Sequence, residues 1–486
     1  MNITPSLNHL LSEINRLAST VDRIEKEMGV LRKENQDLKQ ENQLLKLENQ
    51  NLKQENQTLK QENQTLKRDL ERIKIKKNSN NSHIPPSQDI ARKNKSLRQK
   101  SDKKQGGQFG HDGHTLKMVD TPDEVKDYQP NYCKLCGENL SQIPAILIGS
   151  RQTVEIPPIE PLIIQHNVYR KICNCGYCAD AAFPENITAP ISYGSSVQGL
   201  VSYLHTRQYL PYDRMKEFFN DVLGVSLSGG SLRNMIHRTA NKALPYYEEI
   251  KNRLLKSSVV GSDETSVKVN GDKNWMWTWQ NSNLTFITHS DNRGFDTIKE
   301  HFKDGLPNTI LLHDRYACHF QTTTATHQIC LVHLQRDLQY LNDLYKDKCP
   351  WVLSFRNLIK EAMELKKQLS IQDHYQPHQL RNEMEERLCN LLKEEIDHNF
   401  KKAISLQKSL RKHQDFILTF LYHPKVPPDN NGSEQAIRNI KVKQKVSGLF
   451  RSISGAEDFA ILRSLTDTVL KSGQNVLAAL TLISNA

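Results

Sequence analysis

Four apolar stretches in the middle of the chain decide its fold: SSVVGSDETSVKV (257–269), NWMWTWQ (274–280), LTFITHSDN (284–292) and NTILLHDRYACH (308–319). Their β-branched and aromatic residues are typical of buried strands. A helical stretch, FDTIKEHF (295–302), lies between the third and the fourth. The sequence therefore predicts three consecutive strands, a helix and another strand, with an aspartate ending the first and the last strand.

These aspartates are Asp263 and Asp314. The predicted element order is that of the start of a ribonuclease-H-like sheet, in which the first and fourth strands are neighbours. We therefore expect the two aspartates to lie side by side. Phosphodiester cleavage uses two metal ions roughly 4 Å apart, and Mg²⁺ prefers carboxylate oxygens. With a third acid from a helix, the pair would suit Mg²⁺ or Mn²⁺.

The third acid is Glu434, in PDNNGSEQAIRNIKVKQK (428–445). From the sequence alone, an equally good interpretation is a capping box, in which Asn431 is the helix N-cap and Glu434, three residues later, bonds back to it. Four cations follow on the same predicted helix and are expected to hold a DNA backbone, or else to form a solvated basic face. They are Arg438, Lys441, Lys443 and Lys445.

The charge of the chain is unevenly distributed. The 486 residues carry a net charge of +11, a surplus that favours an anionic partner such as nucleic acid. Between residues 67 and 104 there are thirteen Lys or Arg against four Asp or Glu. Residues 77–120, rich in Lys, Asn, Ser, Gly and Pro, are predicted to be a flexible linker. The cations of this linker either contact DNA phosphates or belong to a spacer that makes no contacts. The candidates for phosphate contact are Arg92, Lys93, Lys103 and Lys104.

The first 76 residues show an unbroken heptad pattern. Leu10, Leu17, Ile24, Leu31 and the residues that continue this spacing to Ile73 take the d positions. Sustained heptads indicate a coiled coil, and asparagine at a positions favours a parallel dimer. The five a-position asparagines are Asn35, Asn42, Asn49, Asn56 and Asn63. Glu at g and Lys at e support the same pairing, so we predict a homodimer; the alternative is a solvated single helix.

Five of the nine cysteines cluster between residues 133 and 178. Cys133 and Cys136 form a Cys-x-x-Cys-Gly knuckle, and Cys173, Cys175 and Cys178 form an irregular second one. Two such knuckles about forty residues apart indicate a zinc ribbon. The expected Zn²⁺ ligands are Cys133, Cys136, Cys173 and Cys175, with Cys178 as the alternative fourth ligand; a module without metal is the other interpretation.

Residues 191–256 are predicted to be helical, with a break near Leu223–Gly224 and a new helix after Ser228. The pattern is compatible with a helix-turn-helix, although a plain helical packing module is the preferred interpretation. No apolar run approaches the roughly 20 residues that cross a bilayer, and the N-terminus lacks the pattern of a secretory signal. We expect no membrane partner and a cytoplasmic, nucleoid-associated protein.

Several motifs, taken together and in order, resemble those of the insertion-sequence sixty-six family of transposases. They are PPSQD (85–89), GGQFGHDGH (106–114), GSDET (261–265), His313–Asp314, CLVHLQRDL (330–338) and DNNGSEQAIR (429–438). The resemblance implies a ribonuclease-H-like fold, a metal-binding triad of Asp263, Asp314 and Glu434, and a helical insertion between the last two. For Cys330 and His333, spaced like ligands, we prefer a helix-packing role.

The expected function is that of a DNA transposase that binds the ends of a mobile element, cleaves the DNA and joins the 3′ ends to a target. Its partners would be double-stranded DNA, a second copy of the chain and, as an open question, accessory proteins of the same element. Two alternatives remain: a coiled-coil DNA-binding protein with an inactive nuclease domain, and a ribonuclease-H-like nuclease without strand transfer.

The expected architecture is a multidomain α+β chain of six segments. They are a coiled coil (1–76), a linker (77–120), a zinc-ribbon-like module (121–190), a helical segment (191–256), a ribonuclease-H-like α/β catalytic domain (257–450) with a helical insertion (about 336–422), and a C-terminal helical segment (451–486).

Overall fold

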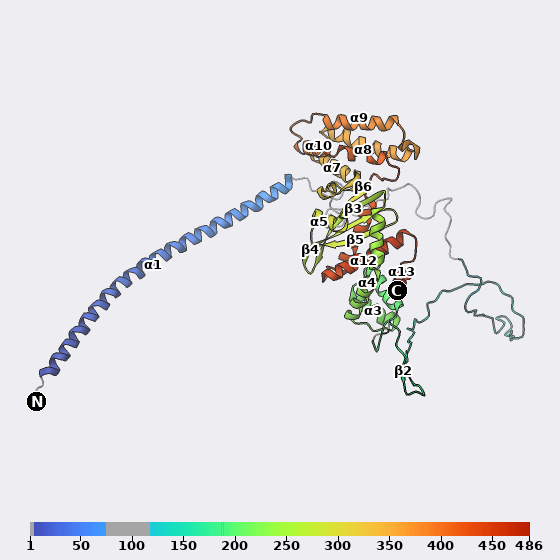
Figure 1. The fold of residues 1–486 in the computed structure, drawn as a ribbon, viewed down its shortest axis with the longest axis horizontal. Coiled ribbons are helices and arrows are strands. Elements are labelled where there is room, and N and C mark those ends of the chain that lie inside the picture. Colours follow the sequence, from blue (N-terminus) through green and yellow to red (C-terminus); the bar gives the residue numbers. More distant parts are fainter. Residues whose placement is uncertain (1–3, 74–116, 186, 188) are drawn as a thin grey trace. The chain divides into compact units, whose positions relative to one another are not determined.

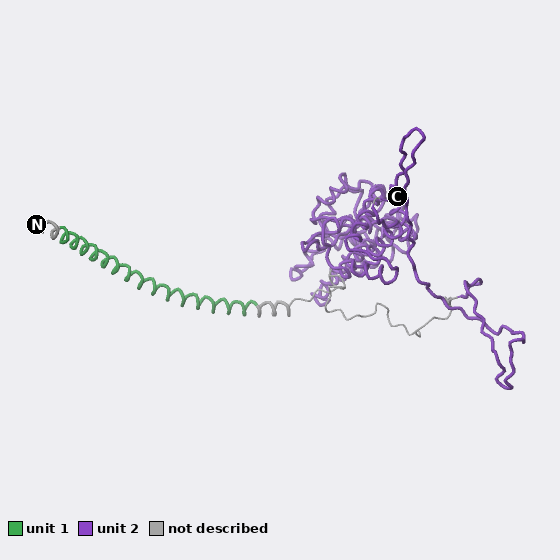
Figure 2. The backbone as a smooth tube through the Cα atoms, turned by 90° about the horizontal axis from the view of Figure 1, so that it is seen from below, with its two compact units in different colours: residues 1–78 green, residues 79–486 purple. Residues whose placement is uncertain are grey.

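The computed structural model describes the backbone of residues 4–73, 117–185, 187 and 189–486. The chain divides into two compact units, Met1–Asn78 and Ser79–Ala486 (Figure 2). Up to residue 116 the predicted linker lies outside the described residues, together with Arg92, Lys93, Lys103 and Lys104. Among the helices that are described, none is both long enough and apolar enough to span a bilayer.

The first unit contains one helix, α1 (Thr4–Ile73), over the stretch with the heptad pattern (Figure 1). In this single chain the heptad leucines face solvent: the exposed fractions of Leu17 and Leu38 are 61% and 55%. Glu and Lys flank this apolar stripe. The helix is therefore as predicted, and the pairing of two such helices stays a prediction.

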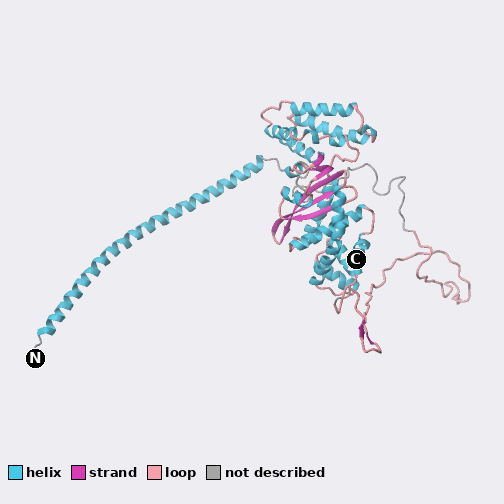
Figure 3. Cartoon of the chain, viewed as in Figure 1, coloured by secondary structure: helices cyan, strands magenta, loops and turns pink. Residues whose placement is uncertain are grey.

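The second unit begins with a stretch of loops. Within residues 117–185 the structure has one hairpin, formed by antiparallel β1 (Arg170–Ile172) and β2 (Cys178–Asp180) (Figure 3). Arg170 pairs with Asp180 across it, with an Nε–Oδ1 distance of 2.6 Å. Residues 151–169 before the hairpin form no strand, and prolines such as Pro157 and Pro158 remove donors from a strand ladder.

The centre of the second unit is a five-stranded sheet with the order β5-β4-β3-β6-β7. Its strands are β3 (Val259–Val269), β4 (Asp272–Gln280), β5 (Thr285–Ser290), β6 (Leu306–His313) and β7 (Thr324–Ile329). The first three are antiparallel neighbours, whereas β6 runs parallel to β3 and β7 parallel to β6. The predicted adjacency of the first and fourth strands is therefore observed.

The strand residues alternate between two packed faces, as the pleat requires. Trp277, Trp279 and Phe286 are buried in one core with residues of α4 (Gly229–Leu255) and α5 (Phe295–His301). Met276 and Ile287 are buried in another core with residues of α11 (Asn431–Ser447) and α12 (Ile453–Lys471). Helices on both sides thus fix the sheet, whose strands β3 and β6 position Asp263 and Asp314.

The predicted helical segment forms α2 (Ser195–Thr206), α3 (Tyr212–Leu223) and α4. Gly224 ends α3 in the left-handed conformation with φ 62°, and Ser228 caps α4 by accepting a hydrogen bond from the Ser231 amide over 3.0 Å. One face of α4 is buried against the sheet, α12, α2 and α13 (Val476–Asn485). This packing supports the packing-module interpretation, and the segments 191–256 and 451–486 share a core with the sheet.

Between Asp314 and Glu434 the chain forms the helical insertion. Its α-helices are α7 (Leu331–Tyr345), α8 (Pro350–Gln368), α9 (Gln379–Lys393) and α10 (Lys401–Arg411); α6 (Ala317–Phe320) precedes them, and three 3₁₀ turns are interspersed, η1 (Gln372–His374), η2 (Gln414–Phe416) and η3 (Thr419–Leu421). The core of the insertion includes Trp351, Phe355 and Phe420, and it extends to Ile310 of β6 and Ile329 of β7.

Candidate active site

Asp263 and Asp314 are brought together by the parallel pairing of β3 and β6. Gly261 pairs with Leu312, and each aspartate lies two residues beyond that pair. The prediction that Asp263 ends its strand is wrong: β3 continues to Val269 because it stays paired with β4 beyond the point where it leaves β6. Asp314 follows the last residue of β6 as predicted.

Asp263 is half-buried within β3. Its Oδ1 accepts a hydrogen bond from the Glu264 amide over 2.9 Å. Burial and then the charges of Glu264, Asp314 and Glu434 raise the pKa of Asp263 well above its usual range. Asp314 and Glu434 therefore both lie close enough to Asp263 for their charges to act on it, although the three acids come from distant parts of the chain.

Asp314 is anchored by the short loop that it begins. Its Oδ1 accepts a hydrogen bond from the Tyr316 amide over 2.9 Å, and His319 Nε2 lies 4.0 Å from the same oxygen. The side chain is partly exposed, with 23% of its surface accessible. One oxygen is thus held by the protein while the carboxylate still reaches solvent.

Glu434 lies in the first turn of α11, where the helix dipole favours a negative charge. The interpretation of Glu434 as a capping glutamate is wrong, because α11 begins one residue earlier than a helix capped by Asn431 would begin. Asn430, and not Asn431, is the N-cap, and the Asn431 amide donates to Asp429 Oδ1 over 3.0 Å. The Glu434 carboxylate instead turns toward α7.

Two residues of α7 approach Glu434. His333 Nε2 lies 3.5 Å from Glu434 Oε1, and Arg336 Nη1 lies 3.6 Å from it. This oxygen is buried and accepts no hydrogen bond from the residues that the structure describes. His333 therefore does more than pack its helix, since its ring also borders Glu434. Cys330 is buried, as a helix-packing role requires.

Asn430 links the segments that carry all three acids. Its side-chain Nδ2 donates to the Ser262 carbonyl oxygen over 2.8 Å, its Oδ1 accepts from Ser433 Oγ over 2.7 Å, and its amide donates to Cys330 Sγ over 3.3 Å. The Cys330 amide in turn donates to the His313 carbonyl oxygen over 2.8 Å. Ser262, His313 and Ser433 are the residues that immediately precede Asp263, Asp314 and Glu434.

Gln280, at the end of β4, extends this network. Its Nε2 donates to Ser433 Oγ over 3.3 Å, and its Oε1 accepts from Lys471 Nζ over 3.0 Å. The packing is so close that a Cβ added to Gly261 would lie 2.6 Å from Asn430 Oδ1. The glycine of GSDET is thus explained by the approach of α11 to the strand.

A second polar cluster lies beside the acids and was not predicted. The buried Glu264 accepts a hydrogen bond from Arg293 Nε over 2.7 Å and lies 3.2 Å from His319 Nε2. Although burial opposes it, the hydrogen bond and charge of His319, with the charge of Arg293, lower the pKa of Glu264. Its position next to Asp263 in GSDET was the only sequence signal for this residue.

The four cations that follow Glu434 have different environments. Arg438 and Lys445 are exposed. Lys441 donates to the Ser266 carbonyl oxygen over 2.5 Å, and Lys443 is buried with its Nζ 5.3 Å from the centre of the Phe450 ring. The predicted phosphate contacts of Lys441 and Lys443 are therefore not supported, because both amino groups are engaged within the protein.

Four of the five clustered cysteines lie in or beside two separate turns, and Cys178 begins β2. Gly137 and Gly176 adopt left-handed conformations with φ 78° and 86° and close turns on Cys133 and Cys173. Hydrogen bonds from the Cys136 and Cys175 amides lower the pKa of Cys133 and Cys173 respectively. Each turn therefore favours a thiolate, as a zinc knuckle requires, but the structure does not bring the two turns together as one cluster.

Within the described part of the chain, no three His, Cys, Asp or Glu side chains are arranged as a ready-made metal site. The acids nevertheless fit a divalent cation chemically. They offer hard oxygen ligands, their mutual repulsion contributes to the raised pKa of Asp263, and one oxygen of Glu434 is buried without a hydrogen bond from the described residues. A cation between them would relieve both conditions.

Comparison with known proteins gives one family. The family model described as "Transposase IS66 family" matches residues 191–458, which is more than half of the chain. The match includes the three acids, the Asn430 network and the helical insertion. No curated protein matches the chain.

Proposed function

Because this chain belongs to the IS66 family of transposases, and therefore has a transposase role, we propose that it cleaves the ends of a mobile DNA element and joins the 3′ ends to target DNA. The observation that carries the proposal is the arrangement of Asp263 and Asp314, each two residues beyond one β3–β6 pair, with Glu434 in electrostatic range. We further propose that the sheet is ribonuclease-H-like, which its strand order and directions support.

In this proposal Asp263, Asp314 and Glu434 hold Mg²⁺ or Mn²⁺. Bound there, such ions would activate the attacking hydroxyl and stabilise the leaving oxygen. The protein positions the carboxylates: the Tyr316 amide orients Asp314, the Glu264 amide orients Asp263, and α7 borders Glu434. Outside this cluster, the exposed Arg438 and Lys445 are the candidates for contact with the DNA backbone.

Two further parts of the proposal concern the N-terminal half. We propose that α1 pairs with a second copy, because its heptad leucines are exposed in the single chain. We also propose Zn²⁺ on Cys133, Cys136, Cys173 and either Cys175 or Cys178, which the lowered pKa values in both turns support. Binding of accessory proteins of the same element stays a prediction.

The test is an assay with Mg²⁺ or Mn²⁺ and DNA that ends in the inverted repeats flanking the gene. Asp263→Asn, Asp314→Asn and Glu434→Gln should each abolish cleavage and preserve DNA binding. The matched control is Asp304→Asn, which changes an exposed acid outside the cluster. Normal cleavage by all three variants would show that the triad is wrongly assigned.

The same assay separates the alternatives. A wild-type protein that binds the ends but never cuts them would be a regulator with an inactive nuclease domain. Cleavage without a joined product would indicate a nuclease that lacks strand transfer. Joined products that disappear with any one acid support the transposase mechanism.

A further inference from the structure

One face of α10 carries only cationic and hydroxyl side chains. Ser405, Lys408, Ser409 and Lys412 follow one another at intervals of three, one and three residues, which places them on the same side of a helix. All four are exposed. The opposite face, with Ala403, Gln407 and Leu410, is buried in the insertion. α10 therefore presents a polar, positively charged surface that its own packing does not use.

This face forms one wall of a pocket of about 450 Å³. The other wall comes from the segment after Asp314. It is lined by Arg315 and by Ala317 and Phe320 of α6, and His413 completes the pocket. Arg315 forms an ion pair with Asp337, and Phe320 stacks on His413 with ring centres 3.8 Å apart. The segment that follows Asp314 and the helical insertion thus meet at a cationic pocket.

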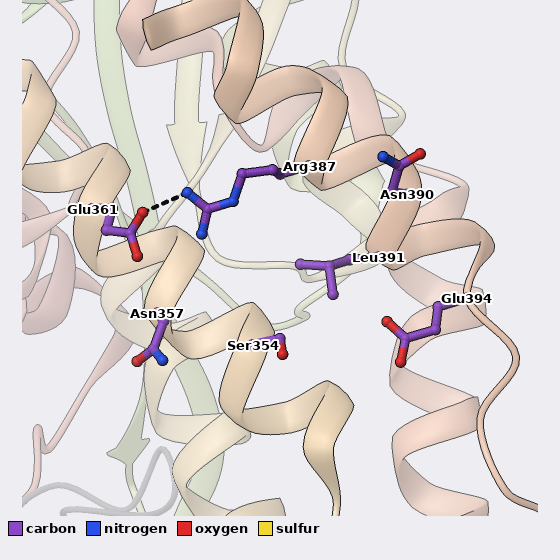
Figure 4. A pocket seen from close by; sticks show the side chains of 7 residues that line it. All are labelled: Ser354, Asn357, Glu361, Arg387, Asn390, Leu391 and Glu394. Atoms are coloured by element: carbon purple, nitrogen blue, oxygen red, sulfur yellow. Dashed lines mark hydrogen bonds and ion pairs between the residues drawn. The ribbon is translucent and has the colours of Figure 1, made fainter.

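The charge of this pocket is unbalanced. Its lining includes no acid, and although Arg315 is paired with Asp337, Lys408 and Lys412 are exposed and add two positive charges. Within residues 399–414 there are five Lys or Arg and no Asp or Glu. A second pocket in the insertion lacks this property: Glu361 and Glu394 accompany Arg387, whose Nη1 lies 2.5 Å from Glu361 (Figure 4). Only the first of these two pockets therefore suits an anion.

We propose that Lys408 and Lys412 bind backbone phosphates of the DNA strand that enters the site at Asp314. The inference rests on the proposed function, since a strand must bring negatively charged phosphates toward three carboxylates. Lysine supplies the compensating charge, and the hydroxyls of Ser405 and Ser409 supply neutral donors, as in other phosphate contacts. Duplex or single-stranded DNA offers the same phosphates, and the proposal concerns the backbone and not the bases.

The experiment measures binding of the full chain to a DNA duplex by fluorescence anisotropy at several salt concentrations, without divalent metal. The variant is Lys408→Gln/Lys412→Gln. Each lost phosphate contact reduces the slope of log K against log salt by about 0.9. We therefore expect the slope to fall by about 1.8 and the affinity to fall roughly tenfold or more near 0.1 M salt.

The matched control is Lys360→Gln/Lys393→Gln, which removes two exposed lysines from α8 and α9 of the same insertion. Lys408→Arg/Lys412→Arg should restore binding because it keeps both charges. Unchanged binding by the Gln variant, or an equal loss in the control, would overturn the proposal. If cleavage depends on the three acids while the Gln variant behaves as wild type, only this inference fails and the proposed function stands.

Discussion

Asn430 donates a hydrogen bond from its side chain to the carbonyl oxygen of Ser262 over 2.8 Å, and so ties the loop before Glu434 to the strand that carries Asp263. Both residues are fully buried. The bond spans 168 positions of the sequence. Asn430 is therefore a residue that aligns the three acids, although it is not one of them.

Replacement of Asn430 should therefore damage the site more than the fold. Asn430→Ala removes the side-chain donor to the Ser262 carbonyl oxygen and the acceptor of the Ser433 hydroxyl, which costs about 1–3 kcal/mol in the free energy of unfolding. Cleavage measured at equal folded fraction should fall by at least about tenfold, because misplaced groups lose orientation. Urea unfolding and single-turnover cleavage measure the two effects.

Gln407→Ala is the matched control for Asn430→Ala. Gln407 is a buried amide that donates to the Leu391 and Glu394 carbonyl oxygens inside the insertion, away from the acids. Its loss should destabilise the protein by a similar amount and leave cleavage by the folded protein unchanged. Equal cleavage defects in the two variants would mean that Asn430 acts through stability alone.

Gly261→Ala should have a similar effect from the side of the strand. The added Cβ would lie 2.6 Å from Asn430 Oδ1 and 2.8 Å from Ser433 Oγ, so these side chains must shift and their hydrogen bonds are disturbed. We expect a loss of about 1–3 kcal/mol from overpacking, with reduced cleavage. Gly230→Ala, whose Cβ would meet only Ser228 Oγ at 3.7 Å, is the control and should be neutral or slightly stabilising.

Lys443 gives a prediction about pH. Burial lowers the pKa of this lysine to about 8, below its ordinary value. Below pH 8 the folded and unfolded chains are both protonated, so folding carries the full cost of the buried charge. Above pH 8 the folded state loses the proton first, and stability rises with pH toward the unfolded pKa of about 10.4.

Lys443→Met removes this cost and should raise the free energy of unfolding at pH 7 by on the order of 1–3 kcal/mol. The advantage should shrink as the pH rises from 8 to 10, and urea titrations across this range measure it. DNA affinity should not change, whereas Arg438→Gln/Lys445→Gln should weaken it. Weaker DNA binding by the Met variant would restore the phosphate role predicted from the sequence.

The zinc proposal makes a simple stoichiometric prediction. The purified full chain should contain about one zinc per chain, because four thiolates complete one tetrahedral site. Cys133→Ser should reduce the content below half, while Cys389→Ser, which changes an exposed cysteine of α9, should not. Elemental analysis measures both, and less than half a zinc in the wild-type chain would contradict the proposal.

The sheet was predictable where its strands carry aromatic and β-branched residues, and its first four strands were placed correctly. The fifth strand, β7, was missed because THQ in its centre is polar and gives no apolar run. The position of Asp263 within its strand also could not be predicted, since it depends on where β3 leaves one neighbour and keeps the other.

The three acids of the candidate site were predictable from the sequence, but the residues that hold or border them were not. Asn430 contacts residues 168 and 100 positions away, and only the folded chain shows these contacts. The same holds for His333 and Arg336 beside Glu434. The burial of Lys443 could not be predicted, because a run of alternating lysines has the same appearance whether its members face solvent or Phe450.

The exposed heptad stripe of α1 leads to the last prediction. Leu38 and Leu45 are 55% and 48% exposed in the single chain, and burial of each leucine against a second helix would contribute about 1.5–3 kcal/mol. The full chain should therefore sediment at twice its own mass at micromolar concentration. Leu38→Lys/Leu45→Lys places two charges in the predicted seam and should shift the protein to the monomer. Gln40→Lys/Gln54→Lys adds the same charge at f positions, outside the seam, and should leave the dimer intact; a wild-type chain that stays monomeric at high micromolar concentration would contradict the pairing.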